Sequence, residues 1–253
     1  MTIKIGMESK NNFGSIIILS AYRKYNDVDI YFPEYDWTYF NAHFGMFKNR
    51  TVKCPYEPRI FNVGYIGEGI YKSKINKEHV RSYTTWYKML QRCYDDMHRY
   101  KFTSYSDCYV CDEWLNYQKF AEWYENNYYE ISSGEQMHID KDILYKGNVI
   151  YSPETCIFVP KTINNLILKR EIDRGDLPIG VWYDESRNNY KACCCDGHGK
   201  IKTIGRYKTV EEAFTSYKDY KEQVIKSIAD IYKNEIPLEL YNALYDYTVD
   251  IYD

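Results

Sequence analysis

MHIDKDILYKGNVIYSPETCIFVPKTINNLILKR, at residues 137–170, is the stretch from which the rest of the chain is interpreted. Its opening run, HIDKDI, alternates His138, Asp140 and Asp142 with two isoleucines and Lys141. Successive residues of a strand point to opposite faces. The run therefore predicts a short strand with His138, Asp140 and Asp142 together on one face.

The remainder of this stretch predicts a loop, a second strand and a helix. Glycine, asparagine and proline residues between positions 147 and 153 are turn signals. The apolar run CIFV at 156–159 has the length and composition of a strand, and Pro160 suits the first turn of a helix. Apolar residues then recur at helical spacing over 163–167, with Asn164 in the first turns.

This order of strand, loop, strand and helix resembles the ββα-metal finger of HNH-type nucleases. The resemblance rests on the HIDKDI strand, the YSPETC loop, the IFVP strand and the asparagine at the start of the helix. The resemblance implies an endonuclease that hydrolyses double-stranded DNA with one divalent metal, Mg²⁺ or a similar cation. It assigns the metal to Asp140, a general-base or ligand role to His138, and orientation of the base or completion of the metal shell to Asn164.

Two positions depart from that family's pattern. The base histidine of the family usually follows an acidic residue directly, whereas Lys141 follows Asp140 here. An asparagine is often found where the second strand begins, whereas this loop ends in Glu154-Thr155. The alternative is a catalytically inactive relative that binds DNA or a protein partner, for example a phage factor acting on a host defence component. In that alternative His138 is simply an exposed strand residue.

Two amphipathic helices are predicted ahead of this stretch, over 83–98 and 112–128. The patterns WYKMLQRCY at 86–94 and YSDCYVCDEWLNYQKF at 105–120 resemble the segment that precedes the ββα unit in many phage-encoded HNH-like proteins. The resemblance implies a protein of a bacteriophage or mobile element, similar to homing endonucleases.

The chain has eight cysteines, and disulfides are not expected in an intracellular protein. Cys108 and Cys111 have the spacing of a zinc knuckle, and Cys93 and Cys156 could complete a four-cysteine structural Zn²⁺ site. The other interpretation is that these are buried thiols that pack as small hydrophobic groups. The three adjacent cysteines at 193–195 cannot all face one metal from a strand, so packing is expected there.

Residues 178–221 predict three strands followed by a helix, and the TVEE sequence at 209–212 is a capping box that opens the helix. The motifs GV, IG-x-Y and T-x-E-E-A-F-x-x-Y at these spacings resemble the AP2 DNA-binding domain, in which a sheet face enters the major groove. The resemblance implies DNA-binding candidates on one sheet face, namely Arg187, Lys191, Lys200, Lys202 and Arg206. An ordinary solvent-facing sheet is the alternative.

The net charge of −3 conceals blocks of alternating sign. Residues 1–82 and 141–208 each carry 12 basic and 8 acidic residues, whereas 83–140 carry 5 and 10, and 209–253 carry 4 and 10. Local patches rather than the total charge set affinity for nucleic acid. The basic blocks are therefore compatible with DNA binding, and the acidic C-terminal end fits a protein partner or a homodimer surface.

The sequence thus predicts an α+β protein in which a helical segment leads into the ββα finger. The predicted parts are a small β-rich accessory module at 1–60, a basic glycine-containing linker at 61–82, an HNH-like domain with its preceding helices at 83–172, an AP2-like domain at 176–221, and acidic, tyrosine-rich helices at 222–253. For the module at 1–60, nucleic-acid binding and plain packing both stay open. No apolar run reaches the length of a membrane span, and a cytoplasmic location without a membrane partner is expected.

Overall fold

A computed structural model describes residues 3–168, 176–197 and 199–252, and the protein is α+β with several small sheets. The chain forms two compact units. The first comprises Met1–Asn126 with Val149–Ser152, and the second comprises Asn127–Asn148 with Pro153–Asp253. Within the described ranges, no helix is both long and apolar enough to cross a membrane. The predicted boundary between residues 172 and 176 lies outside the described residues.

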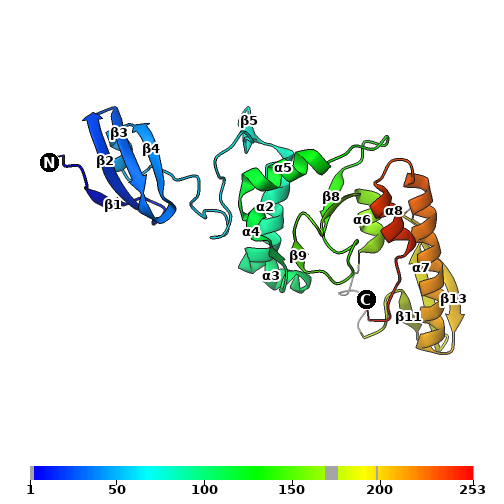
Figure 1. Cartoon of the computed structure of the whole chain (residues 1–253). Helices are drawn as coiled ribbons and strands as arrows, with labels where there is room; N and C mark the ends of the chain where they lie inside the picture. The colour runs from blue at the N-terminus through cyan, green and yellow to red at the C-terminus, as the bar shows by residue number, and fades with distance from the viewer. Residues whose placement is uncertain (1–2, 169–175, 198, 253) are drawn as a thin grey trace. The chain divides into compact units, whose positions relative to one another are not determined.

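A four-stranded antiparallel sheet, in the order β1-β2-β3-β4, forms the N-terminal part of the first unit (Figure 1). Its elements are β1 (Glu8–Lys10), β2 (Ile16–Lys24), β3 (Asp27–Phe32), the 3-10 turn η1 (Pro33–Tyr35), β4 (Trp37–Ala42) and helix α1 (Phe44–Lys48). Alternation along β3 buries Val28, Ile30 and Phe32, and Phe44 and Phe47 of α1 join the same core. The predicted small β module is thus built around one hydrophobic cluster.

The rest of the first unit is mainly helical. Its elements are β5 (Lys74–Ile75), β6 (Glu78–His79), α2 (Arg81–Tyr94), α3 (Asp96–Lys101), η2 (Thr103–Tyr105), β7 (Tyr109–Val110), α4 (Asp112–Leu115), α5 (Tyr117–Asn127) and β9 (Ile150–Tyr151). β9 lies in the long loop predicted between the two finger strands, and it pairs in parallel with β7. Trp86 and Trp114 are fully buried, and the Trp86 indole Nε1 donates to the Trp114 carbonyl at 2.6 Å.

Each of the two helices predicted over 83–98 and 112–128 is interrupted, which corrects the sequence interpretation. The first breaks at Asp95, whose carboxylate accepts a hydrogen bond from the His98 N–H at 2.7 Å and so caps α3. The second breaks at Asn116, because Tyr65 pairs with the chain there. The Tyr65 N–H donates to the Leu115 carbonyl and the Tyr117 N–H donates to the Tyr65 carbonyl, both at 2.9 Å.

Two side chains of α5, Tyr117 and Gln118, hold the segment predicted as a linker, at 61–82. The Tyr117 hydroxyl donates to the Lys72 carbonyl at 3.1 Å. The Gln118 amide oxygen accepts from the Tyr71 N–H at 2.9 Å, and its Nε2 donates to the carbonyls of Tyr71 at 3.0 Å and Ile66 at 3.3 Å. At Gly69, an added Cβ would lie 2.2 Å from the Gln118 Oε1 atom. Glycine is therefore needed there because the backbone approaches this amide closely.

The second unit contains a two-stranded antiparallel sheet of β10 and β8 and a three-stranded antiparallel sheet in the order β11-β12-β13. Its elements are β8 (Met137–Asp140), β10 (Ile157–Pro160), α6 (Lys161–Ile167), β11 (Val181–Asp184), β12 (Asn189–Cys195), β13 (Ile201–Tyr207), α7 (Val210–Tyr232) and α8 (Leu238–Tyr245). The predicted capping box at the start of α7 is confirmed. The Glu212 N–H donates to Thr209 Oγ1 at 3.2 Å, and the Thr209 N–H donates to Glu212 Oε2 at 3.3 Å.

Helix α7 takes part in two hydrophobic clusters. Near its N-terminus, Ala213, Phe214 and Tyr217 pack in a cluster with Val181 and Ala192 of the three-stranded sheet. Towards its C-terminus, three further residues join a cluster with β10, α6 and α8; this cluster contains Ile225, Ile228, Ala229, Val159, Ile163, Leu166, Leu240 and Leu244. One helix therefore packs against both the two-stranded sheet of β8 and β10 and the three-stranded sheet.

Glu135 fixes the start of α6, the helix that carries Asn164. Its Oε2 accepts from the Thr162 N–H at 2.8 Å, and its Oε1 accepts from the Tyr232 hydroxyl at 2.6 Å. Burial alone would raise the pKa of the Glu135 carboxyl, but these hydrogen bonds outweigh burial and hold the pKa below its usual range. The carboxylate thus joins α6 to α7.

Replacing Glu135 by alanine should lower the free energy of unfolding by about 1 kcal/mol at neutral pH, since an acceptor at a helix start is lost. In the unfolded chain the glutamate has a pKa of about 4.3, and in the folded protein the pKa of Glu135 is lower. The contribution is therefore present above the unfolded pKa and is lost as the pH falls through the folded pKa. Urea unfolding at neutral and at acid pH measures the difference between wild type and variant. Glu185→Ala, in an exposed turn, is the control and should change stability by less than about 0.5 kcal/mol.

Candidate functional site

The strand β8 places His138 and Asp140 on one face, as the sequence predicts, but the strand ends at Asp140. Asp142, predicted on the same strand face, lies instead in the bend that follows, and its N–H donates to Asp140 Oδ1. His138 lies opposite Val159 and Asp140 lies opposite Ile157 in the antiparallel pair with β10. His138 and Asp140 keep partial solvent exposure, whereas Ile139 between them is buried. Because the two side chains are two residues apart on a strand, both are directed to the same side of the finger.

The helix α6 brings Asn164 to this face. α6 follows directly from β10, and the Asn164 amide Nδ2 lies 3.3 Å from His138 Nδ1. Two proton arrangements satisfy this contact: the amide N–H donates to a bare Nδ1, or the flipped amide oxygen accepts from Nδ1–H. Only the second leaves Nε2 without its proton in the neutral ring, and it is therefore the arrangement that a general base requires.

The Asp140 carboxylate is held rigidly by the backbone that follows it. Its Oδ1 accepts from the Asp142 N–H at 2.9 Å and from the Ile143 N–H at 2.8 Å. Burial, and next the charge of Asp142, raise the pKa of Asp140 to about 6 in spite of these two hydrogen bonds. An ionised carboxylate is therefore costly at this position in the absence of a cation.

The two predicted metal ligands leave most of a metal's coordination shell to other groups. His138 and Asp140 supply one imidazole nitrogen and one carboxylate. In the described ranges, no group of three or more His, Cys, Asp and Glu residues is arranged to hold a metal ion. Mg²⁺ is commonly bound through one or two carboxylates, with water and substrate phosphates completing its octahedron. The Asp140 carboxylate is a ligand of this kind, whereas the His138 imidazole is more typical of Zn²⁺ or iron.

The four cysteines considered as structural zinc ligands are divided between the two units. Cys93, Cys108 and Cys111 belong to the first unit and Cys156 to the second. Cys93, Cys108 and Cys156 are buried, and Cys111 is half-buried. The zinc site stays a prediction.

Lys141 has a role that the sequence did not reveal. Its side chain is buried, and its Nζ donates to the Asn148 carbonyl at 2.8 Å, while the Asn148 Nδ2 donates back to the Lys141 carbonyl at 2.6 Å. This reciprocal pair closes the loop after β8. The turn signal at Asn148 was visible in the sequence, but nothing in the sequence paired it with Lys141.

The outer face of the three-stranded sheet collects part of the predicted DNA-binding set. Trp182, Lys191 and Arg206 lie directly opposite one another across β11, β12 and β13, so they form one row on the face that points away from α7. Arg206 also pairs with Asp184, at 2.5 Å between Nη1 and Oδ2. Arg187 is exposed in the turn between β11 and β12.

Lys202 differs from the expectation that all five cations share one face. A bulge between Ala192 and Cys193 shifts the register, so that Ala192 pairs with Gly205 but Cys193 pairs with Thr203. The extra residue reverses the alternation beyond it. The Lys202 Nζ accordingly lies 5.2 Å from the ring centroid of Tyr220 on α7. Lys200 is exposed in the turn before β13.

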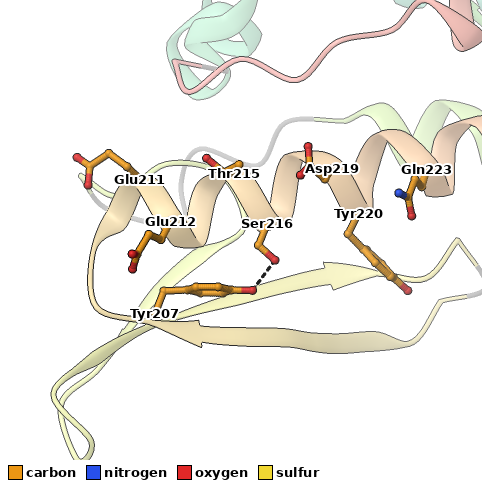
Figure 2. A pocket seen from close by; sticks show the side chains of 8 residues that line it. All are labelled: Tyr207, Glu211, Glu212, Thr215, Ser216, Asp219, Tyr220 and Gln223. Carbon is orange, nitrogen blue, oxygen red and sulfur yellow. Dashed lines mark hydrogen bonds between the residues drawn. The ribbon is translucent and has the colours of Figure 1, made fainter.

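An open groove runs between α7 and the edge strand β13, and its lining is acidic (Figure 2). The residues that line it are Tyr207, Glu211, Glu212, Thr215, Ser216, Asp219, Tyr220 and Gln223. The Tyr207 hydroxyl donates to Ser216 Oγ at 2.6 Å and joins strand to helix. The carboxylates of Glu211, Glu212 and Asp219 give this side of the module a negative charge.

Comparison of the chain with protein-family models, with curated proteins and with solved structures gave no match.

Asp140→Asn should stabilise the metal-free protein near neutral pH by an amount on the order of 1 kcal/mol. The folded pKa of about 6 lies above the unfolded value of about 3.9, so the ionised carboxylate lowers stability as the pH rises between those values. Asparagine keeps the oxygen that accepts the two N–H bonds and removes the charge. Thermal melts with a chelator at about pH 5 and about pH 7.5 test this, and a lower melting temperature for the variant at the higher pH would contradict it.

Proposed function

We propose that the chain is a divalent-metal-dependent DNA endonuclease of HNH type, directed to duplex DNA by an AP2-like sheet. In this proposal β8, β10 and α6 form a ββα-metal finger, and β11, β12, β13 and α7 form the AP2-like module. The protein would act in the cytoplasm of the host of a bacteriophage or mobile element, as homing endonucleases do.

One observation carries the catalytic part of the proposal. The Asn164 amide meets His138 Nδ1 at 3.3 Å, and Asp140 stands on the same face of β8. A histidine oriented through one ring nitrogen, beside a rigid carboxylate, is the arrangement that a general base and a metal ligand need.

The chemistry assigned to these residues is phosphodiester hydrolysis. His138 Nε2 takes a proton from water, the resulting hydroxide oxygen bonds to phosphorus, and one bridging P–O bond breaks. The departing oxygen takes a proton from the solvent. Asp140 would hold Mg²⁺, and in the alternative arrangement His138 would be a metal ligand as well. The bound cation would polarise the phosphate and stabilise the leaving oxygen. Asn164 keeps the imidazole ring oriented throughout.

DNA binding is assigned to the outer sheet face. Its row of Trp182, Lys191 and Arg206 offers two cations and an aromatic ring that is 44% exposed. Arginine and lysine reach guanine edges and phosphates, and a sheet can lie in the major groove. Arg187 and Lys200, in the adjoining turns, would add phosphate contacts.

His138→Ala should reduce Mg²⁺-dependent nicking of supercoiled plasmid by about 10²–10⁴-fold, because a general base is lost. Asn164→Asp should retain more activity than Asn164→Leu, since a carboxylate accepts from Nδ1–H and keeps Nε2 available. The negative charge should also raise the pKa of His138 and move the acidic limb of the pH–rate profile upward.

Plasmid nicking unaffected by His138→Ala would contradict the catalytic proposal. Nicking lost equally in both Asn164 variants, with no shift of the pH profile, would reduce Asn164 to a packing role. Binding of duplex DNA without cleavage in any divalent cation would identify the inactive relative. The absence of DNA binding would instead indicate a protein partner, and the C-terminal helices would then be the candidate surface for that partner or for a homodimer.

Lys191→Ala should weaken duplex binding several-fold. It should also make the slope of log K against log salt less steep by about 0.9, the change expected for one lost phosphate contact. Lys202→Ala is the matched control from the same sheet, because its ammonium lies on the α7 side. Fluorescence anisotropy across a salt series measures both. Equal losses for the two variants would contradict the assignment of the outer face.

A further inference from the structure

The first unit carries a cationic patch around an exposed aromatic ring, here called the Phe13 patch and consisting of Phe13, Arg50, Lys53 and Arg59. We infer that the Phe13 patch is a second, sequence-independent DNA contact that binds the phosphates of duplex DNA. The proposal rests on the DNA function proposed above, but it concerns a module to which no part of that mechanism has been assigned.

Phe13 brings two cations together. The Lys53 Nζ lies 5.1 Å and the Arg59 guanidinium carbon 5.3 Å from the centroid of its ring, and the ring is 46% exposed. Both distances lie within the range of cation–π attraction. The flexible side chains of a lysine and an arginine are thereby partly ordered before any ligand arrives, which reduces the entropy lost when they bind a phosphate.

The turn that carries Phe13 is anchored in the module. Asn11 is buried, its Oδ1 accepts from the N–H groups of Phe13 at 3.0 Å and Ser15 at 2.9 Å, and its Nδ2 donates to the Val52 carbonyl at 3.1 Å. The next residue, Asn12, donates its N–H to the Arg50 carbonyl at 2.8 Å. These bonds join the Phe13 turn to the segment that bears Arg50 and Lys53, so the backbone that presents the patch is held in place.

The charge of the patch is poorly balanced by the protein itself. The acidic residue beside it, Glu57, is 2% exposed and accepts hydrogen bonds from Asn11 and from the Cys54 N–H. Its Oε2 lies 3.9 Å from Arg59 Nε, and this nitrogen is buried without a hydrogen bond among the described residues. Arg50 and Lys53 are exposed. Of the three cations, Arg59 is the one that lies beside this buried carboxylate, and the exposed cations of the patch complement a polyanion.

A phosphate backbone is the ligand that this chemistry fits best. Its charges are closely spaced, and cations that neutralise them release condensed counterions, which provides affinity without reading sequence. Guanidinium and ammonium groups are the usual phosphate donors. The patch contains no second exposed aromatic ring to continue a base stack, so duplex DNA is favoured over a splayed single strand.

The test uses the full chain with a fluorescent duplex of random sequence, in a chelator that prevents cleavage. Arg50→Asn combined with Lys53→Ala should lower the slope of log K against log salt by about two, at about 0.9 per phosphate. Asparagine is chosen at Arg50 because that residue has a φ of 61°, which asparagine tolerates.

Phe13 is a positioning residue and should behave differently. Phe13→Leu keeps the apolar bulk but removes the ring, so affinity should fall several-fold while the salt slope stays nearly unchanged, and Phe13→Tyr should restore the affinity. A purely structural role for the ring would instead lower the melting temperature and leave affinity unchanged in the folded protein.

The matched control is Lys226→Ala combined with Lys233→Ala. These lysines also lie over aromatic rings, 5.8 Å from Tyr245 and 5.4 Å from Tyr241, but they flank Asp230 in the acidic C-terminal region. Their removal should leave the slope unchanged. The inference is overturned if the Arg50/Lys53 variant keeps the wild-type slope of log K against log salt, or if both double variants reduce that slope equally. It is also overturned if the wild-type protein does not bind the duplex.

The nuclease proposal and this inference fail separately. If plasmid nicking survives His138→Ala but the Arg50/Lys53 variant still loses about two units of slope, the patch stands as a DNA contact and only the catalytic assignment falls. If nicking depends on His138 and the slope does not respond to Arg50 and Lys53, the patch is excluded and the nuclease remains.

Discussion

The second unit depends on one helix packing against two partners. α7, at 23 residues, is about 35 Å long at about 1.5 Å per residue. Its first half buries Ala213, Phe214 and Tyr217 with the three-stranded sheet, and its second half buries Ile225 and Ile228 with β10, α6 and α8. A single rigid element thereby sets the distance between the face proposed to bind DNA and the site proposed to cut it, which a flexible linker could not do.

The middle of α7 shows how the two cores are joined. Lys221 is buried there, and its Nζ donates to the Leu166 carbonyl in the last turn of α6 at 2.5 Å. A cation is favoured at a helix C-terminus because the last carbonyls carry partial negative charge. Burial nevertheless lowers the pKa of Lys221. The chain thus accepts a buried lysine at the point where α6 must be held against α7, and Glu135 fixes the opposite end of the same short helix.

The limits of prediction from the sequence follow from the range of the interactions. The alternation that places His138 and Asp140 on one face and the capping box at Thr209 are local patterns, and both were predicted correctly. The helix break at Asn116 arises from pairing with Tyr65, which lies far away in the sequence, and the position of Lys202 arises from a bulge that depends on the neighbouring strand. Long-range pairing of backbone groups leaves no periodic signal in the chain, so these features could not be derived from it.

The apparent departure at Lys141 can be understood from the same strand geometry. Neighbouring residues on β8 face opposite sides, so Lys141 turns into the protein to close the loop at Asn148, and it could not have met Asn164 from there. His138, two residues before Asp140, occupies the face that α6 covers. The pKa of the Asp140 carboxyl is raised by burial, so keeping this carboxylate ionised costs stability. In the proposed nuclease a bound cation would offset that cost, which would account for an aspartate, rather than its uncharged amide, at position 140.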